Sequence, residues 1–152
     1  MNERPYPSGI DCVWLASDGE GRLAAFITAG EGPIPAEALK VDRLPVEDIE
    51  GSIGGMLRVS EACLLVEIKR PDDFIAFADR GLFVYDWTDV HRTSRQAVHA
   101  YEAVATPTKP ISLDRLPSDL AGVARALRFV DVSFADSTRL DVCAYMPCSM
   151  SE

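Results

Sequence analysis

The 152-residue chain has few histidines, no long apolar run and no excess of basic residues, and each of these absences excludes a class of protein. No apolar run exceeds five residues, far below the roughly 20 that a membrane-spanning helix needs, so we expect no membrane segment. Asp and Glu number 24 against 15 Lys and Arg, a net charge of −9. This balance argues against nucleic acid as a partner, because nucleic-acid binding requires a basic surface.

The first ten residues, MNERPYPSGI, contain an early acid and two prolines and no apolar stretch. This composition lacks the features of a secretory signal, so we expect a cytoplasmic protein. In that compartment the four cysteines should be reduced. Cys143 and Cys148 lie within CAYMPC, a spacing that is neither CxxC nor paired with a second dithiol. Small buried thiols or an exposed tail are the favoured interpretation, and a redox or zinc role is the alternative.

Motifs of nucleotide, metal and catalytic sites are also missing. The glycine-and-acid stretches near Asp18 and Glu31 lack the GxxxxGK[ST] pattern that holds phosphate and the regularly placed oxygen ligands of a calcium loop. His91 and His99 are the only histidines, and their spacing is not that of a helical metal pair. No GxSxG motif marks a serine nucleophile, and no local signature marks a cysteine nucleophile. We therefore expect no catalytic residue, no cofactor and no metal.

What is present is the pattern of an ordinary globular domain, with 47% apolar and 26% charged residues. We expect one domain over residues 1–152, of the α+β class, with a mainly antiparallel sheet of about five to seven strands and two or three packed helices. Residues 11–17 and 22–28 should form a hairpin around the turn Asp18-Gly19-Glu20-Gly21. Further strands are predicted near 62–69, 82–87, 99–105, 128–134 and 140–146, the last two as a closing hairpin.

Two segments have a clear helical pattern. Residues 71–80 begin with Pro71 and two acids and end before Gly81, and residues 117–127 begin with Ser118 as an expected cap. The inward side chains should be Phe74, Phe77, Leu120, Val123 and Leu127. The segment VEDIEGSIGGML, residues 46–57, indicates a weak third helix because it contains three glycines.

The acidic residues are concentrated in the first third of the chain, where residues 1–50 carry 10 acids and 4 bases. Residues 31–50 contain six of these acids and only two bases, and their prolines favour an extended, exposed segment with unpaired charges. We interpret this segment as a surface for a basic partner. Its acidic residues are Glu31, Glu37, Asp42, Glu47, Asp48 and Glu50.

The stretch YDWTDVHR has two interpretations. Tyr85 and Trp87 share one face of a strand and Asp86 takes the other, so the two rings can lie in the core. The alternative is a recognition patch formed by Asp86, Trp87 and Asp89, because tryptophan is a favoured anchor at protein interfaces. We include these three residues as a secondary partner-binding patch.

The stretches DCVWLASDGEGRLAAFITAGEGPIP, RGLFVYDW and AYEAVATPTKPISLDRLPSDLAGVA resemble small acidic bacterial immunity proteins of polymorphic toxin and contact-dependent inhibition systems. The resemblance implies a protein that binds and occludes a cognate toxin domain with a basic surface and that performs no chemistry itself. The alternative hypothesis is a small enzyme or a ligand-binding module of unrecognised type, and a third is a purely structural or regulatory partner domain. A deep pocket with a perturbed Cys, His or acid would favour that alternative.

Overall fold

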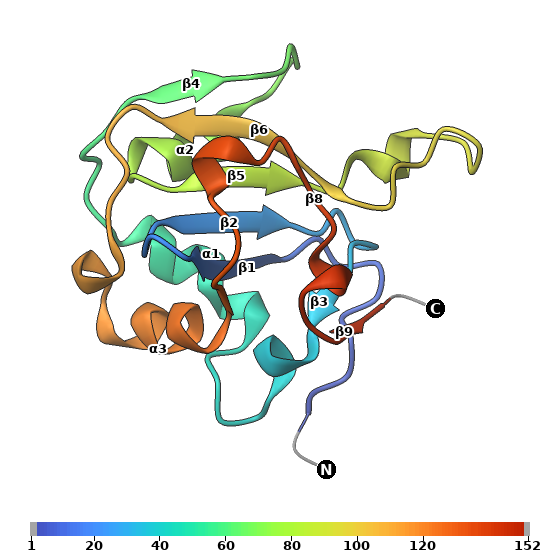
Figure 1. Cartoon of the computed structure of the whole chain (residues 1–152), viewed down its shortest axis with the longest axis horizontal. Coiled ribbons are helices and arrows are strands. Elements are labelled where there is room, and N and C mark those ends of the chain that lie inside the picture. The colour runs from blue at the N-terminus through green and yellow to red at the C-terminus, as the bar shows by residue number, and fades with distance from the viewer. Residues whose placement is uncertain (1–2, 151–152) are drawn as a thin grey trace.

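The computed structural model describes residues 3–150 and has the α+β architecture expected from the sequence, in one compact domain (Figure 1). Three α-helices accompany a mixed seven-stranded sheet and a small two-stranded sheet. The helices are α1 (Val46–Gly54), α2 (Asp72–Asp79) and α3 (Ser118–Ala126). The strands of the main sheet are β1 (Val13–Asp18), β2 (Leu23–Ile27), β4 (Ala62–Leu64), β5 (Phe83–Asp86), β6 (Tyr101–Pro107), β7 (Arg128–Phe129) and β8 (Arg139–Leu140), and the small sheet consists of β3 (Ile34–Pro35) and β9 (Cys148–Ser149).

The main sheet has the strand order β4-β6-β5-β2-β1-β7, and β8 pairs with one end of β6. Four of its pairings are antiparallel: β1 with β2, β5 with β6, β4 with β6, and β6 with β8. The pairings of β2 with β5 and of β1 with β7 are parallel, because the chain crosses over through helices before each of these strands returns to the sheet. The sheet is therefore mixed, with antiparallel pairs in the majority.

The predicted hairpin is present, and its turn depends on Asp18. The Asp18 Oδ1 atom accepts hydrogen bonds from the backbone N–H groups of Glu20 (2.9 Å) and Arg22 (3.0 Å). Gly21 has φ +79°, which a residue with a Cβ rarely adopts. At Gly19 a Cβ would lie 2.3 Å from the carbonyl oxygen of Val130. Gly19 therefore permits the C-terminal segment to approach the turn closely.

An aromatic cluster fills the core on one face of the sheet. Trp14 stacks on Phe26 with ring centroids 4.1 Å apart, and Phe26 stacks on Tyr85 at 4.9 Å, because these three residues are register partners on β1, β2 and β5. Phe129 and Phe134 from the C-terminal part of the chain pack against Phe26. Aromatic pairs of this kind stabilise the folded state more than the burial of their apolar surface alone would.

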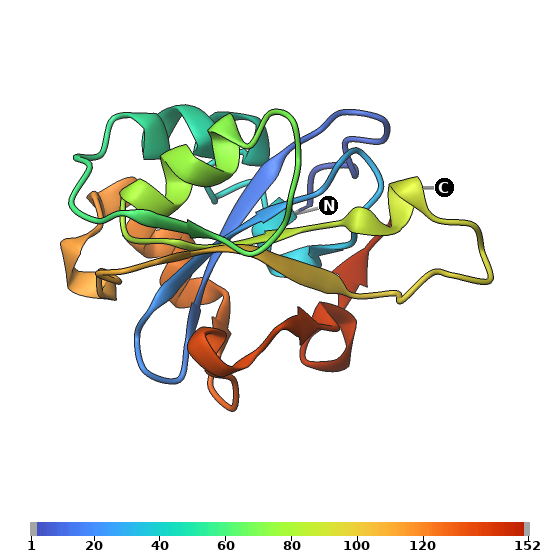
Figure 2. The ribbon, with the colours of Figure 1, turned by 90° about the horizontal axis from the view of Figure 1, so that it is seen from above.

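Figure 2 shows α1 and α2 on one face of the sheet and the C-terminal segment on the opposite face. The predicted helix faces are confirmed: Phe74 and Phe77 of α2 are buried, and so are Leu120 and Val123 of α3 and the following Leu127. α3 packs beside β1, where the Ser17 hydroxyl donates a 2.7 Å hydrogen bond to the carbonyl of Ala124. The weak helix expected at 46–57 forms as α1, whose inward residues are Val46, Ile49 and Ile53.

The predicted closing hairpin is wrong. The only strands in this region are Arg128–Phe129 and Arg139–Leu140, and they pair with β1 and β6 rather than with each other. Short 3₁₀ turns at Phe134–Asp136 and Val142–Ala144 occupy the remainder. The apolar residues of this segment are spaced for burial against the sheet, which the sequence pattern does not distinguish from strand pairing.

Two further details differ from expectation. The strand predicted at 62–69 is shorter: β4 ends at Leu64, and one further hydrogen bond joins the Leu65 N–H to the carbonyl of Val104 at 2.9 Å. Leu64, Leu65 and Ile68 are all exposed. Ser118 is the first residue of α3 rather than its cap: Pro117 holds that position, and no side chain caps the helix.

Candidate functional site

A group of carboxylates comes together where α1 and α2 begin and β5 ends. We name this group the acidic face and define it as Asp11, Glu47, Glu50, Asp73 and Asp86. Asp11 precedes β1, Glu47 and Glu50 lie on α1, Asp73 lies in the first turn of α2, and Asp86 is the last residue of β5. Glu47, Glu50 and Asp86 are among the partner-binding residues predicted from the sequence, and the fold adds Asp11 and Asp73.

Asp11 is the common neighbour of the acidic face, because its charge acts on both Glu50 and Asp86. Burial raises the pKa of Glu50, and the charges of Asp73 and Asp11 raise it further. Burial also raises the pKa of Asp11, and the charge of Asp73 raises it further. A 2.9 Å hydrogen bond from the Ala29 N–H to the Asp11 Oδ1 atom acts in the opposite direction. The charge of Asp73 therefore makes ionisation of both Asp11 and Glu50 less favourable.

Asp86 is the most strongly perturbed member of the acidic face. Burial, followed by the charge of Asp11, raises the pKa of Asp86 to about 6, although His91 acts in the opposite direction. Its register partner on β6 is another acid, Glu102. A carboxylate with this environment lowers the stability of the free protein at neutral pH, and such groups are concentrated at functional sites.

None of the five residues of the acidic face forms an ion pair within residues 3–150. Acids in a first helical turn interact favourably with the helix dipole, which accounts for Glu47 and Asp73. Asp11 and Asp86 lie outside the helices and have no such compensation. The acidic face is therefore a concentration of negative charge that the described part of the protein does not neutralise.

Cys12 lies in the core next to the acidic face and is 4% exposed. Burial raises the pKa of its thiol to about 11, with contributions from the charges of Glu47, Asp11 and Glu50. The thiol is protonated at neutral pH, whereas a nucleophilic cysteine requires the thiolate. Cys12 therefore acts as a small apolar side chain.

The rest of segment 31–50 is less extended than predicted. Gly32, Pro33 and the two residues of β3 are buried, and the Tyr101 hydroxyl donates a 2.9 Å hydrogen bond to the carbonyl of Pro33. The prolines hold this stretch against the core instead of exposing it. Residues 36–39 form a 3₁₀ turn, and residues 46–54 form α1.

The six acids of this segment consequently have different environments. Glu31, Asp42 and Asp48 are exposed, as Glu47 and Glu50 are. Glu37 is paired internally, with its carboxylate 2.6 Å from Lys40 Nζ and 3.3 Å from Arg43 Nη2, so the expectation of unpaired charge is wrong there. The charge available to a partner is therefore concentrated on α1.

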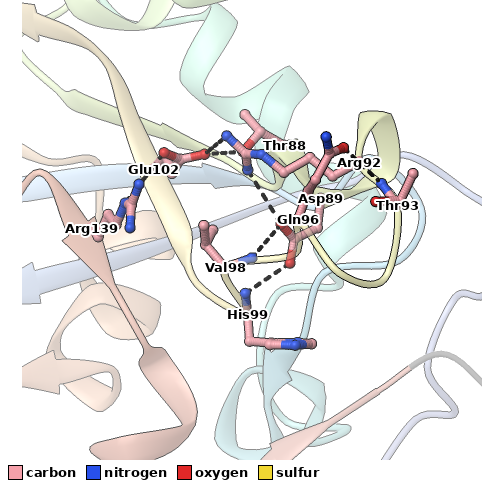
Figure 3. Close-up of polar contacts among 9 residues, drawn as sticks. All are labelled: Thr88, Asp89, Arg92, Thr93, Gln96, Val98, His99, Glu102 and Arg139. Atoms are coloured by element: carbon pink, nitrogen blue, oxygen red, sulfur yellow. Dashed lines mark hydrogen bonds and ion pairs between the residues drawn. The ribbon is translucent and has the colours of Figure 1, made fainter.

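Asp89 stabilises a loop, residues 88–99, that projects beyond the sheet (Figures 1 and 3). The two Asp89 carboxylate oxygens accept hydrogen bonds from the N–H groups of Val98 (2.9 Å) and His99 (2.8 Å), and Arg92 lies 3.2 Å from one of them. Although burial opposes it, these contacts hold the pKa of Asp89 below its usual value. His99 has φ +53°, and this backbone strain occurs where Asp89 holds its N–H.

Glu102 of β6 connects the projecting loop to the sheet. Its Oε1 atom lies 2.6 Å from Arg92 Nη2 and also accepts a hydrogen bond from the Thr88 hydroxyl, and its Oε2 atom lies 3.5 Å from Arg139 Nε (Figure 3). This network fixes the base of the loop. Both histidines, His91 and His99, are exposed on it.

Trp87 lies in the core, in agreement with the first interpretation of YDWTDVHR. Its side chain is 7% exposed and packs edge-to-face against Tyr101, with ring centroids 5.1 Å apart. Of the secondary patch, Asp86 belongs to the acidic face, Asp89 holds the projecting loop and Trp87 is buried in the core. Partner binding by these residues stays a prediction.

Within residues 3–150 no three His, Cys, Asp or Glu side chains are arranged to hold a metal ion. Burial raises the pKa of the Cys148 thiol, and the adjacent Cys143 raises it further. In the same part of the chain no helix is both long and apolar enough to cross a bilayer.

A comparison of the chain with protein-family models, curated proteins and solved structures finds no match.

Proposed function

We propose that this protein is an inhibitor of the bacterial immunity type, which binds a basic toxin domain through the acidic face and occludes it. The observation that carries the proposal is the acidic face itself, in which burial and neighbouring carboxylates raise the pKa of Asp11, Glu50 and Asp86, and whose five residues have no ion-pair partner within residues 3–150. A basic surface placed against these side chains relieves the repulsion between them. Binding of a basic partner would therefore also neutralise the charge of the acidic face.

The projecting loop 88–99 supports an occluding mode of action. Its base is fixed by Asp89, Arg92 and Glu102, so it is already ordered before a partner arrives. A fixed loop loses little conformational entropy on binding, which favours tight association. It emerges directly after Asp86, and therefore lies beside the acidic face. One partner can contact both.

The proposal is tested by co-expression with the toxin domain encoded beside the gene for this chain. The expected result is that the toxin domain alone arrests bacterial growth and that co-expression of this chain restores it. If this chain inactivated the toxin domain by catalysis, less than one molecule of the chain per toxin domain would be enough. Occlusion requires one molecule of the chain for each toxin domain. Titration of purified toxin activity distinguishes the two. Growth arrest that persists on co-expression contradicts the proposal.

The contribution of the acidic face is measured with a charge-reversal variant. Replacing Glu47, Glu50 and Asp73 by Lys changes the net charge from −9 to −3. The same change at Glu67, Asp131 and Asp136, which are exposed elsewhere, gives a matched control. Electrostatic steering predicts that the first variant associates with the toxin domain at least about tenfold more slowly at low salt, with a smaller difference as salt screens the charges. If both variants slow association equally, only net charge matters and the acidic face is not the site.

A further inference from the structure

A basic and apolar groove lies at the end of the sheet opposite the projecting loop. We define the groove by residues 55–61 and 108–117, which lie side by side in both ribbon views (Figures 1 and 2). Between these two segments are three hollows of about 430, 250 and 450 Å³. They adjoin, because Val59 lines all three and Ile111 and Arg115 line the first two.

The wall at 55–61 is held by Asp79, the last residue of α2, and by Arg80, which follows it. Arg80 donates hydrogen bonds from its guanidinium to the carbonyls of Gly54 (3.1 Å), Met56 (3.0 Å) and Ala76 (2.9 Å). The carbonyl of Asp79 accepts the N–H groups of Val59 (2.8 Å) and Ser60 (2.9 Å). The backbone of this wall is therefore fixed at several points.

The opposite wall, residues 108–117, is fixed to the residues that follow α2 and to the turn of the first hairpin. The Ile111 N–H donates a 3.1 Å hydrogen bond to the carbonyl of Gly81, and the Leu113 N–H donates one of 2.9 Å to the carbonyl of Gly21. Gly81 has φ +91°, and a Cβ there would lie 2.6 Å from Ile111 Cγ2, so this approach requires glycine. Both walls are pre-formed, which reduces the conformational entropy that a ligand must remove on binding.

The charge of the groove is opposite to that of the protein. Four of the 15 basic residues line its hollows, Arg58, Arg80, Lys109 and Arg115, together with one acid, Glu61. A second acid, Asp114, is exposed on the 108–117 wall, where its carboxylate accepts a hydrogen bond from the Ser112 hydroxyl. Arg58 pairs with Asp79 at 2.8 Å, but Lys109 and Arg115 have no ion-pair partner within residues 3–150. This is a local positive surface on a chain of net charge −9.

Large apolar side chains line the same groove and are exposed. Leu57 is 81% exposed and Val59 is 47% exposed, and both lie beside Met56, Ile111 and Leu116. Removing apolar surface from water is favourable by roughly 25 cal/mol per Å². A ligand with an apolar group and flanking negative charges would therefore match both properties of the groove.

We propose that the groove binds an extended acidic peptide segment of a partner protein, in which an apolar side chain packs on Leu57 and Val59 and flanking carboxylates pair with Lys109 and Arg115. Three adjoining hollows between two chain segments fit an extended stretch of chain better than a single compact ligand. A nucleic acid would bring phosphates to a strongly acidic protein and would leave the apolar lining unmatched. This binding is independent of the proposed toxin inhibition, because the groove and the acidic face lie at opposite ends of α1 and α2.

The experiment selects peptides from a phage-displayed library of random 12-residue sequences on the immobilised full chain. The selected peptides are synthesised with a fluorescent label, and binding is measured by fluorescence anisotropy. We expect sequences enriched in Asp and Glu around Leu, Ile or Phe. The variant Lys109→Glu/Arg115→Glu should bind these peptides at least about tenfold more weakly at low salt, because it reverses the charge of the groove.

Matched variants isolate the contribution of the groove. The control Arg95→Glu/Arg125→Glu alters net charge equally at exposed sites elsewhere and should change binding by less than about twofold. Leu57→Ser should weaken binding, whereas Val130→Ser, at a residue 67% exposed outside the groove, should not. Thermal unfolding of each variant shows whether the fold is retained.

Four outcomes overturn the proposal. The first is a selection without enrichment, and the second is enrichment of basic peptides alone, which would bind the acidic face. The third is equal weakening of binding by the groove and control variants. The fourth is displacement of the selected peptides by a 12-nucleotide single-stranded DNA, which would assign the groove to nucleic acid.

Discussion

The carboxylate of Asp18 accepts a 2.9 Å hydrogen bond from the backbone N–H of Phe134, which joins the first hairpin to the C-terminal segment. Asp18 is fully buried, and its other oxygen accepts the N–H groups of Glu20 and Arg22 within the turn. One side chain therefore satisfies backbone donors from two distant parts of the chain. A buried donor without a partner lowers stability by about 1–3 kcal/mol.

Replacing Asp18 by Ala should lower the free energy of unfolding by about 2–4 kcal/mol, because the Phe134 N–H is left buried without an acceptor and the turn loses two hydrogen bonds. Urea denaturation measures the change. Glu20→Ala, at an exposed residue of the same turn, is the control and should alter stability by less than about 0.5 kcal/mol. Equal effects of the two substitutions would show that Asp18 has no special role.

Replacing Asp86 by Asn should stabilise the protein at neutral pH. The folded pKa of Asp86, about 6, lies above its ordinary value of 3.8, so the folded state keeps a proton that the unfolded chain releases between these values. Stability from this group is therefore complete below about pH 4 and is lost as the pH rises through about 6. Part of the side chain is in water, which limits the gain from Asn to about 1–2 kcal/mol at neutral pH.

The measurement is urea denaturation of both proteins from about pH 4 to about pH 8. The two stability curves should converge near pH 4, separate progressively between about pH 4 and about pH 6, and keep a constant difference at higher pH. Asp131→Asn, at an exposed residue away from the acidic face, should follow the original protein throughout. Parallel curves for the Asp86→Asn protein and the original protein at every pH would contradict the raised pKa.

Replacing Asp89 by Ala should loosen the projecting loop more than it destabilises the rest of the protein. The N–H groups of Val98 and His99 lose their acceptor, and Arg92 loses one of its two carboxylate partners. Hydrogen exchange at residues 98 and 99 should accelerate, with a loss of about 1–2 kcal/mol in global stability. Ser94→Ala, in the exposed part of the same loop, should change neither quantity. Unaltered exchange at residues 98 and 99 would contradict the role of Asp89.

Treatment with a chelator should leave the melting temperature unchanged, because we expect no structural metal. The pair Cys143 and Cys148 is the place where this expectation is tested most directly. Elemental analysis of the purified protein provides the second measurement. Stoichiometric zinc, or a clear fall in melting temperature on chelation, would assign a metal role to these two cysteines.

The helices and the first hairpin could be predicted because their determinants are local. Pro71 and Gly81 bound α2, and Phe74 and Phe77 recur at the spacing of one helical face. The turn at Asp18-Gly19 likewise lies within the segment that it shapes. The charge of α1 could also be predicted, since Glu47 and Glu50 remain exposed once the helix has formed.

Prediction from the sequence failed for segments whose packing partners lie far away in the chain. An apolar pattern requires burial but does not specify the surface that provides it, so residues 128–146 cover the sheet instead of forming their own hairpin. The prolines of residues 33–35 indicated an extended chain, but the hydroxyl of Tyr101 and the aromatic core determine that this chain is buried.

The amino-acid sequence by itself determined the amount of negative charge and its concentration in the first third of the chain. Only the tertiary structure decided that Asp11, Asp73 and Asp86 join Glu47 and Glu50, because β5 lies next to β2 and the two helices begin at the same end of the sheet. The structure likewise brought Arg115 and Lys109 to the segment of Leu57 and Val59. Charge is a property of each residue, whereas the field at a surface depends on distances that folding alone sets.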